Sequence, residues 1–286
     1  PGVRREGDGE PGGQRPGVRE EKGYTLIHPF DDEEVIAGQG TIGLEIIDQL
    51  KDTDAIVVPV GGGGLIAGLA FAVKSLNPSI KVYGVQSTGA PSMLNSLEHH
   101  KLEAPASVST IADGIAVKEP GKNTYEMCSK YVDRIVSVTD DQVSAAILAL
   151  IEKQKMIAEG AGAVSLAAVM FGKIPDIAGK KVVCLISGGN IDVTILSRVI
   201  NRGLLMSGRT TTMTIELVDK PGQLVAVSAI IAGCGGNVTA VLHERSNEGT
   251  DVNGCYLHLT IETRDFDHIK EIEEKLTSSG FKLIKP

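Results

Sequence analysis

Residues 55–73 carry the clearest hydrophobic pattern in the chain. An uncharged apolar run ends at Val60, four glycines follow at Gly61–Gly64, and apolar helix-forming residues continue to about Leu76. A short apolar run bounded by glycine is typical of a buried strand, and the longer run after it is typical of a helix. The pattern predicts a strand, a tight loop and a helix that stops at Asn77-Pro78.

Strands and helices alternate in this way to about residue 205. We expect Thr41 to cap a helix before the first strand, Thr139 and Gln142 to form a capping box, and Glu159 to open an apolar helix. Residues 87–133 are less regular. Further elements are expected at 81–86, 134–138 and 181–186 (strands) and, after Ser187-Gly188-Gly189-Asn190, at 193–205 (helix). This order predicts an α/β fold with a parallel sheet, whose ligand crevice lies at the carboxyl ends of the strands.

A smaller unit begins near residue 208. Its expected strands are 211–218, 238–243, 255–262 and 281–284, and its expected helices are 223–232 and 267–277. The order is βαββαβ, the ferredoxin-like arrangement, which hosts many functions. The chain is therefore divided into an irregular segment (1–23), an α/β domain (24–207) and a second domain (208–286).

The glycines at 61–64 favour an anion as ligand. Residues without Cβ let successive backbone N–H groups converge, and the following helix adds the positive end of its dipole. No Lys-Ser or Lys-Thr follows, which argues against a nucleoside triphosphate. A dinucleotide is a lesser alternative, because Gln86 stands where a ribose-binding acid is expected. Another alternative is that the glycines form only a turn that brings the strand and the helix close together.

Composition and charge narrow the choice of partner. The 286 residues are 42% hydrophobic but only 3% aromatic, so an aliphatic core is expected. The formal net charge is −8 without a long basic run, which argues against nucleic acid or an anionic membrane. Pro59 and the glycines would break a spanning helix, and residues 1–23 lack an apolar signal core. We expect a cytoplasmic protein with a small-molecule ligand.

The cysteines indicate no metal site. Cys128, Cys184, Cys234 and Cys255 are widely spaced, with no C-x-x-C motif and no neighbouring pair of histidines. Buried thiols are the expected arrangement.

Five segments together resemble the threonine dehydratases (threonine ammonia-lyases), fold-type II pyridoxal-phosphate enzymes, in the form with a C-terminal ACT domain. They are Ile36-Ala-Gly-Gln-Gly-Thr41, Val58–Gly64, Ile111-Ala-Asp-Gly114, Glu159-Gly-Ala-Gly162 and Ser187-Gly-Gly-Asn190. The resemblance runs from about Tyr24 to the end. It implies an incomplete parallel-sheet catalytic domain of the tryptophan synthase β type, followed by a ferredoxin-like ACT domain.

The resemblance also implies a site for pyridoxal 5′-phosphate. Its phosphate would be held by Gly61, Gly62, Gly63, Gly64 and Leu65. Ser187 would lie beside the pyridine nitrogen, where a hydroxyl suits β-elimination; the alternative for this residue is a helix N-cap. Glu159 would be the acid near the ring and the substrate; its alternative is stabilisation of the first turn of a helix.

Two features of the family are missing. The Schiff-base lysine of the family lies in a Ser-x-Lys-x-Arg motif upstream of the glycines, but Lys22 and Lys51, the only lysines before Gly61, lie in no such motif. We therefore expect a truncated chain without a catalytic residue and with negligible turnover by itself. Where related enzymes place carboxylates for a divalent cation, this chain has Gln86 and Ser92, so no metal site is expected there.

The second domain resembles ACT domains, which bind amino acids where two copies meet. The residues that match its ligand loops are Asp219, Pro221, Gly222, Gly236, Asn237 and Val238. Asn237 is a natural partner for the polar groups of an amino acid, or else a turn residue. A homo-oligomer under allosteric control by an amino acid is implied.

Two functions follow from these observations. The first is a threonine ammonia-lyase, which converts L-threonine to 2-oxobutanoate and ammonia by β-elimination, with serine as a further expected substrate. The second is a non-catalytic regulatory chain that binds amino acids, which the missing lysine favours. A nicotinamide enzyme would need the acid that Gln86 does not provide.

Overall fold

The computed structural model describes residues 27–245 and 253–284, so the predicted irregular segment at 1–23 lies outside the described residues. Two compact units divide between Leu196 and Ser197. This division falls inside helix α8 (Val193–Met206), whereas the sequence pattern placed the domain boundary after that helix. Within the described ranges, no helix has the length and apolar character needed to cross a membrane.

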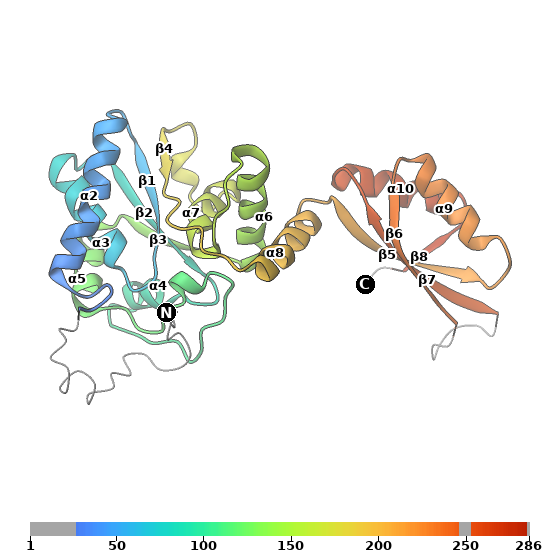
Figure 1. Ribbon diagram of the computed structural model, residues 1–286, viewed down its shortest axis with the longest axis horizontal. Helices are drawn as coiled ribbons and strands as arrows, with labels where there is room; N and C mark the ends of the chain where they lie inside the picture. Colours follow the sequence, from blue (N-terminus) through green and yellow to red (C-terminus); the bar gives the residue numbers. More distant parts are fainter. Residues whose placement is uncertain (1–26, 246–252, 285–286) are drawn as a thin grey trace, which may run out of the picture. The chain divides into compact units, whose positions relative to one another are not determined.

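The first unit is built on a four-stranded sheet in the order β3-β2-β1-β4. All three strand pairings are parallel, as the alternation of strands and helices predicted. Figure 1 shows α2, α3 and α5 on one face of the sheet and α6 and α7 on the other. The strands are β1 (Ala55–Pro59), β2 (Lys81–Ser87), β3 (Arg134–Val138) and β4 (Val182–Cys184). The helices are α2 (Glu33–Gln49), α3 (Gly64–Leu76), α5 (Lys122–Tyr131), α6 (Asp140–Ala149) and α7 (Gly160–Met170).

Helix α2 begins earlier than the sequence pattern indicated. Asp32 is its N-cap, and its carboxylate accepts hydrogen bonds from the backbone N–H groups of Glu34 at 3.0 Å and Val35 at 3.2 Å. Thr41 lies inside the helix, where its hydroxyl donates to the Gly38 carbonyl. The prediction that Thr41 caps this helix is therefore wrong, because the residues from Glu33 to Thr41 are already helical.

Glycines allow α2 and α3 to approach closely. A Cβ built on Gly68 of α3 would overlap the carbonyl oxygen of Ile36 in α2. A Cβ on Gly40 would lie 3.2 Å from the Gly68 oxygen, and one on Gly43 would lie 3.0 Å from the Leu69 oxygen. The two backbones are thus nearer to each other than side chains at these positions would permit.

Residues 87–133 hold more regular structure than the pattern indicated, namely α4 (Ser92–Glu98), a 3₁₀ turn at Asp113–Ile115 and α5. The N-terminus of α5 has no capping side chain of its own. Instead, the Asp31 carboxylate accepts from the backbone N–H groups of Lys122 and Thr124, both at 3.1 Å and 91 and 93 positions away in sequence. A cap from so distant a segment leaves no local signal.

The second unit has the predicted βαββαβ order. Its antiparallel sheet has the strand order β6-β7-β5-β8, and α9 and α10 cover one face (Figure 1). The apolar side chains of the covered face, including Ile215, Ile231 and Leu257, form a buried core with the helices. The elements are β5 (Thr210–Val218), α9 (Gln223–Gly233), β6 (Asn237–Glu244), β7 (Gly254–Glu262), α10 (Phe266–Ser278) and β8 (Lys282–Ile284).

The cysteines are free thiols in different settings. Cys128 and Cys255 are buried, as predicted, whereas Cys184 and Cys234 are half-buried. Burial raises the pKa of the Cys128 thiol to about 12 and that of Cys184 to about 11. Neither of these two thiols is ionised near neutral pH, which suits packing rather than nucleophilic chemistry.

The close crossing of α2 and α3 predicts opposite effects for two helical glycines. Gly68→Ala should lower the free energy of unfolding by about 3 kcal/mol, because the backbones must separate to admit the methyl group. Gly38→Ala should raise it by about 0.5–1 kcal/mol, because a Cβ on Gly38 has nothing within 4 Å and alanine favours the helix. Urea unfolding followed by circular dichroism measures both. Equal effects of the two changes would contradict the close contact.

Candidate cofactor site

Gly61–Gly64 form the turn between β1 and α3. Gly63 has φ 99° and ψ −7°, a left-handed conformation that favours glycine. None of the hydrogen bonds found between described residues uses the backbone N–H groups of Gly61 to Leu65. Such a run of N–H groups without protein acceptors, at the start of a helix, is suited to bind an anion.

Thr124 holds the glycine loop through the carbonyl group of Gly62. Its buried hydroxyl lies 2.6 Å from the Gly62 carbonyl oxygen and 3.1 Å from that of Gly121. The Gly121 N–H also donates to the Gly62 oxygen, at 3.4 Å. These bonds hold the Gly62 carbonyl towards the start of α5, and Asp31 caps that same helix.

Phe30 packs directly on the glycines. A Cβ on Gly62 would overlap the Phe30 ring, and a Cβ on Gly64 would lie 2.8 Å from the Phe30 carbonyl oxygen. The segment that supplies Phe30 also supplies Asp31 and Asp32, which cap α5 and α2. One short segment therefore buttresses the loop and both neighbouring helices.

Glu159 lies where two other predicted segments meet. Its backbone N–H donates to the Gly188 oxygen at 3.0 Å. A Cβ on Gly188 would overlap Oε1 of Glu159, and one on Gly114 would lie 3.3 Å from the same oxygen. A Cβ on Gly61 would in turn lie 3.1 Å from Cα of Ile115. The glycine loop, residues 111–114, Glu159 and residues 187–190 are therefore neighbours in the fold.

The structure bears on the alternative roles predicted for the two polar residues. Ser187 is exposed, and α8 begins only at Val193, where the Asp192 carboxylate accepts from the Thr194 N–H at 2.7 Å. Ser187 is therefore not the N-cap of α8. Glu159 is the N-cap residue of α7, but its side chain makes no capping hydrogen bond. Its carboxylate is turned towards Gly114 and Gly188 instead.

The sequence pattern did not indicate that Asp140 positions part of the candidate site. The sequence indicated only that it begins a helix. In the fold its carboxylate accepts from the Thr110 hydroxyl at 2.6 Å and the Ile111 N–H at 3.0 Å, and the Ser87 hydroxyl lies 3.3 Å away. It thus anchors the segment that continues to Gly114 beside Glu159.

Gln86 and Ser92 use their polar atoms inside the protein. The Gln86 amide donates to the Val60 carbonyl at 3.2 Å and accepts from the Leu94 N–H at 2.8 Å. The Ser92 hydroxyl donates to the Val117 carbonyl at 2.8 Å. Both side chains have structural roles at the end of β2 and the start of α4.

The predicted effector residues lie at opposite ends of the second sheet within one copy of the chain. Val218, next to Asp219, pairs with Gly254 through the β5–β7 ladder, whereas Asn237 pairs with Glu262 at the other end of β7. The Asn237 amide also donates to the Glu262 carboxylate at 2.8 Å. Asp219, Pro221 and Gly222 therefore do not meet Gly236, Asn237 and Val238 in one copy.

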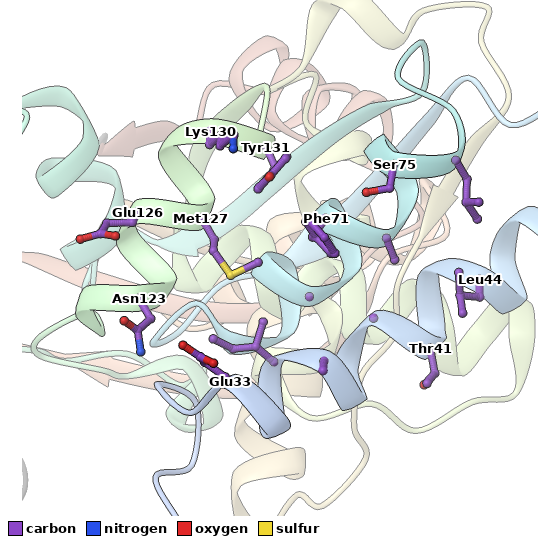
Figure 2. Close-up of a pocket in the computed structure, with 16 residues that line it drawn as sticks. Glu33, Thr41, Leu44, Phe71, Ser75, Asn123, Glu126, Met127, Lys130 and Tyr131 are labelled. Carbon is purple, nitrogen blue, oxygen red and sulfur yellow. The ribbon is translucent and has the colours of Figure 1, made fainter.

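A groove of about 750 Å³ lies over α2, α3 and α5 (Figure 2). Phe71, Met127 and Leu44 line it, with Glu33, Glu126 and Lys130 among its polar residues. It includes none of the residues that the sequence indicated for the cofactor, so it is a separate feature of the helical face.

The residues around the glycine loop fit the phosphate of a pyridine cofactor. The N–H groups of Gly61–Leu65, which have no acceptor among the described residues, suit the phosphate, and a Cβ on Gly63 would lie 2.6 Å from Cε of Met93. The cradle thus depends on glycine. A parallel sheet with a phosphate loop at the carboxyl end of a strand defines a class of ligand-binding α/β protein.

Comparison with known proteins identifies the family. Residues 14–188 match the family described as pyridoxal-phosphate dependent enzyme, and the chain belongs to it. The L-threonine ammonia-lyases of Thermotoga maritima and Geobacter sulfurreducens are 47% and 43% identical over 93% and 92% of this chain. The processed threonine deaminase isoform 2 of Solanum lycopersicum has a TM-score of 0.63 at 41% identity over 66% of this chain.

The matches cover only part of each relative. The chain spans 66% and 65% of the length of the two bacterial relatives and 52% of the tomato chain. Since the bacterial matches cover more than nine tenths of this chain, they extend into the second unit. Members of the family depend on pyridoxal phosphate, in agreement with the predicted cofactor.

The buried Thr124 hydroxyl predicts a stability effect at the site. Thr124→Val keeps the shape of the side chain but leaves the Gly62 carbonyl without its shortest hydrogen bond. The free energy of unfolding should therefore fall by about 1–3 kcal/mol. Thr41→Val, at an exposed hydroxyl that bonds within α2, is the matched control and should change the stability by less than about 0.5 kcal/mol. Denaturant midpoints compare the two, and equal midpoints would contradict this role for Thr124.

Proposed function

We propose that this chain is the cofactor-binding part, together with a regulatory domain, of a pyridoxal-phosphate-dependent L-threonine ammonia-lyase. The observation that carries the proposal is the convergence of the glycine loop, residues 111–114, Glu159 and residues 187–190. The identity to two L-threonine ammonia-lyases over most of the chain supports the substrate. The reaction would convert L-threonine to 2-oxobutanoate and ammonia, and serine is proposed as a second substrate.

Each residue of the site has a proposed task. The N–H groups of Gly61–Gly64 and Leu65 bind the phosphate of the cofactor, with help from the dipole of α3. The Ser187 hydroxyl is the neutral partner of the pyridine nitrogen. The Glu159 carboxylate faces the ring and the amino-acid substrate. When bound, the cofactor supplies an electron sink that acidifies the α-proton of the substrate.

No residue of this chain is assigned to remove that proton. Lys22 and Lys51, the lysines that precede Gly61, lie outside a Ser-x-Lys-x-Arg motif, and Lys51 is exposed in the turn after α2. A second candidate function is that of a non-catalytic chain that binds amino acids and regulates full-length subunits, which the loops of the second unit that resemble ACT ligand loops support. The two candidates share the phosphate loop and differ in turnover.

The second unit is proposed to act as an ACT-type regulatory domain. Its βαββαβ fold and the loops at Asp219–Gly222 and Gly236–Val238 support this role. Because these loops lie at opposite ends of one sheet, an amino acid that contacts both needs a second copy of the chain. A homo-oligomer is therefore part of the proposal.

The phosphate site predicts a specific effect of one glycine. Gly63→Ala should weaken pyridoxal phosphate binding about tenfold or more, because alanine disfavours φ near 99° and its methyl group would meet Met93 and Thr124. Gly172→Ala is the control: its φ is also left-handed, at 61°, but a Cβ has nothing within 4 Å and the residue follows the far end of α7. Titration of cofactor absorbance measures both. Equal affinities would contradict the assignment of the loop.

The missing lysine predicts the activity of the purified chain. With pyridoxal phosphate and L-threonine, 2-oxobutanoate should not form above the rate of free cofactor, because no base is held at the α-carbon. Borohydride reduction and peptide mapping should find no single labelled lysine. Turnover together with one specific labelled lysine would overturn this prediction and support the enzyme over the regulatory chain.

A further inference from the structure

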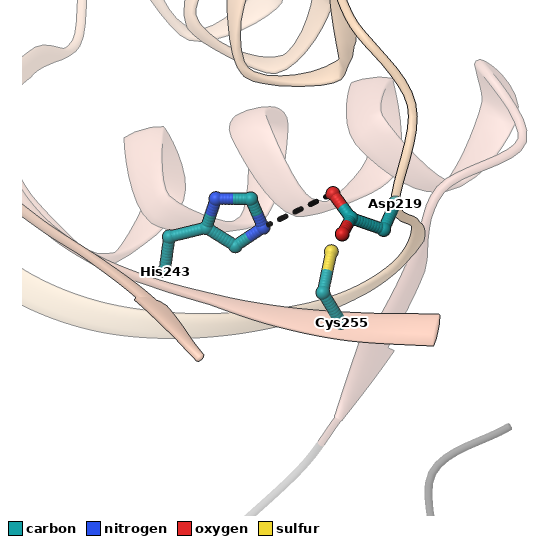
Figure 3. A group of neighbouring side chains, drawn as sticks. All are labelled: Asp219, His243 and Cys255. Carbon is teal, nitrogen blue, oxygen red and sulfur yellow. Dashed lines mark ion pairs between the residues drawn. The ribbon is translucent and has the colours of Figure 1, made fainter. Parts of the chain in front are cut away.

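Three potential metal ligands meet in the second unit, outside the cofactor site. Asp219 follows β5, His243 lies in β6 and Cys255 lies at the start of β7. One ligand atom from each lies within 4.8 Å of the others. Figure 3 shows the Cys255 sulfur pointing towards the Asp219 carboxylate, and the His243 ring facing the same carboxylate from a different side. Nε2 of His243 is 3.9 Å from Oδ1 of Asp219.

Strand register explains why these residues converge. Leu217 pairs with Cys255 across β5 and β7, which brings Asp219, two positions on, to the same end of the sheet. His243 pairs with Leu257, two positions after Cys255. Residues two apart on a strand share a face, and so do paired residues on neighbouring strands. His243 and Cys255 therefore project from the same face, above which the Asp219 carboxylate lies.

The donor set suits a borderline-soft divalent cation. Imidazole nitrogen, thiolate sulfur and carboxylate oxygen are the zinc ligands of proteins, and softer sulfur selects against magnesium and calcium. Tetrahedral coordination at the usual bond lengths places ligand atoms about 3.3–3.7 Å apart. The ligand atoms now lie within 4.8 Å of one another, so each pair would need to approach by at most about 1.5 Å. Three protein ligands leave the fourth position for water.

Arg245 now balances the charge of the Asp219 carboxylate. Its Nε lies 3.0 Å from Oδ2 and its Nη2 lies 3.4 Å from Oδ1. The Arg245 side chain is 66% exposed, so it can turn into solvent without leaving a buried gap. A divalent cation and the guanidinium would compete for the same two oxygens.

We propose that Asp219, His243 and Cys255 form a zinc site in the second unit. The ion would join the β5–α9 turn to β6 and β7. The site lies within one copy of the chain, whereas the proposed amino-acid site needs two, and only Asp219 belongs to both. The spacing of the cysteines predicted no metal site, because the ligands are 24 and 12 positions apart and no short motif contains them.

The test uses the purified full chain and the metal alone. Zinc binding, measured by competition with a chromogenic chelator, should saturate at one ion per chain. Cobalt(II) should give the near-ultraviolet charge-transfer band of a thiolate ligand. His243→Gln should weaken zinc binding at least about tenfold, and Cys255→Ser should abolish the cobalt band. Arg245→Gln should tighten zinc binding severalfold, because the competing cation is removed.

Two controls separate this site from surface binding. Cys234→Ser changes another thiol of the same unit, and His99→Gln changes an exposed histidine of the first unit; both should leave affinity and spectrum unchanged. Cys255 is buried, so its replacement also perturbs the core of the second unit. His243 is exposed, and its replacement tests the site without that effect. Unchanged affinity in His243→Gln, or a full cobalt band in Cys255→Ser, would overturn the proposal.

Discussion

Close contact between backbone segments at glycine residues is the constraint on which the first unit depends. The Ile36 carbonyl rests on Gly68, the Ile111 carbonyl on Gly160, and the Gly188 carbonyl on Gly162, each where a Cβ would collide. These contacts bring helices and loops nearer than side-chain packing allows. The candidate site is consequently built mostly from backbone atoms. The groups proposed to bind the anion are N–H donors whose positions are set by the fold, so little conformational entropy would be lost when a phosphate binds.

The parts of the fold that the sequence predicted are those with local signals. The β1–loop–α3 unit, the capping box at Thr139 and the βαββαβ order each arise from residues close together in the chain, and all three are confirmed. The predicted start of α2 was wrong, because Thr41 was taken as its N-cap and the helix already begins after Asp32. The glycines of α2 serve the crossing with α3, and that requirement is visible only when both helices are in place.

Contacts between distant segments account for what the sequence could not indicate. Asp31 caps a helix some ninety positions away, and Asp140 holds a segment thirty positions before it. Neither of these long-range interactions belongs to a motif, because the spacing between the partners is set by the fold. The same reason hides the cluster of Asp219, His243 and Cys255, whose members come from three different strands or their ends. The sequence was most informative for the glycine loop, where chemistry and spacing coincide.

The arrangement of the site separates binding from catalysis. N–H groups that hold a phosphate stabilise the bound ground state and the transition state equally, so they contribute affinity without acceleration. Acceleration needs a group whose interaction changes as the α-proton leaves, and the tasks proposed for Glu159 and Ser187 concern the ring and the substrate rather than that proton. A chain with this loop alone would keep cofactor and amino-acid binding while losing turnover. The two proposed functions, enzyme and regulatory chain, thus share one proposed binding surface, and a single basic side chain at the α-carbon would distinguish them.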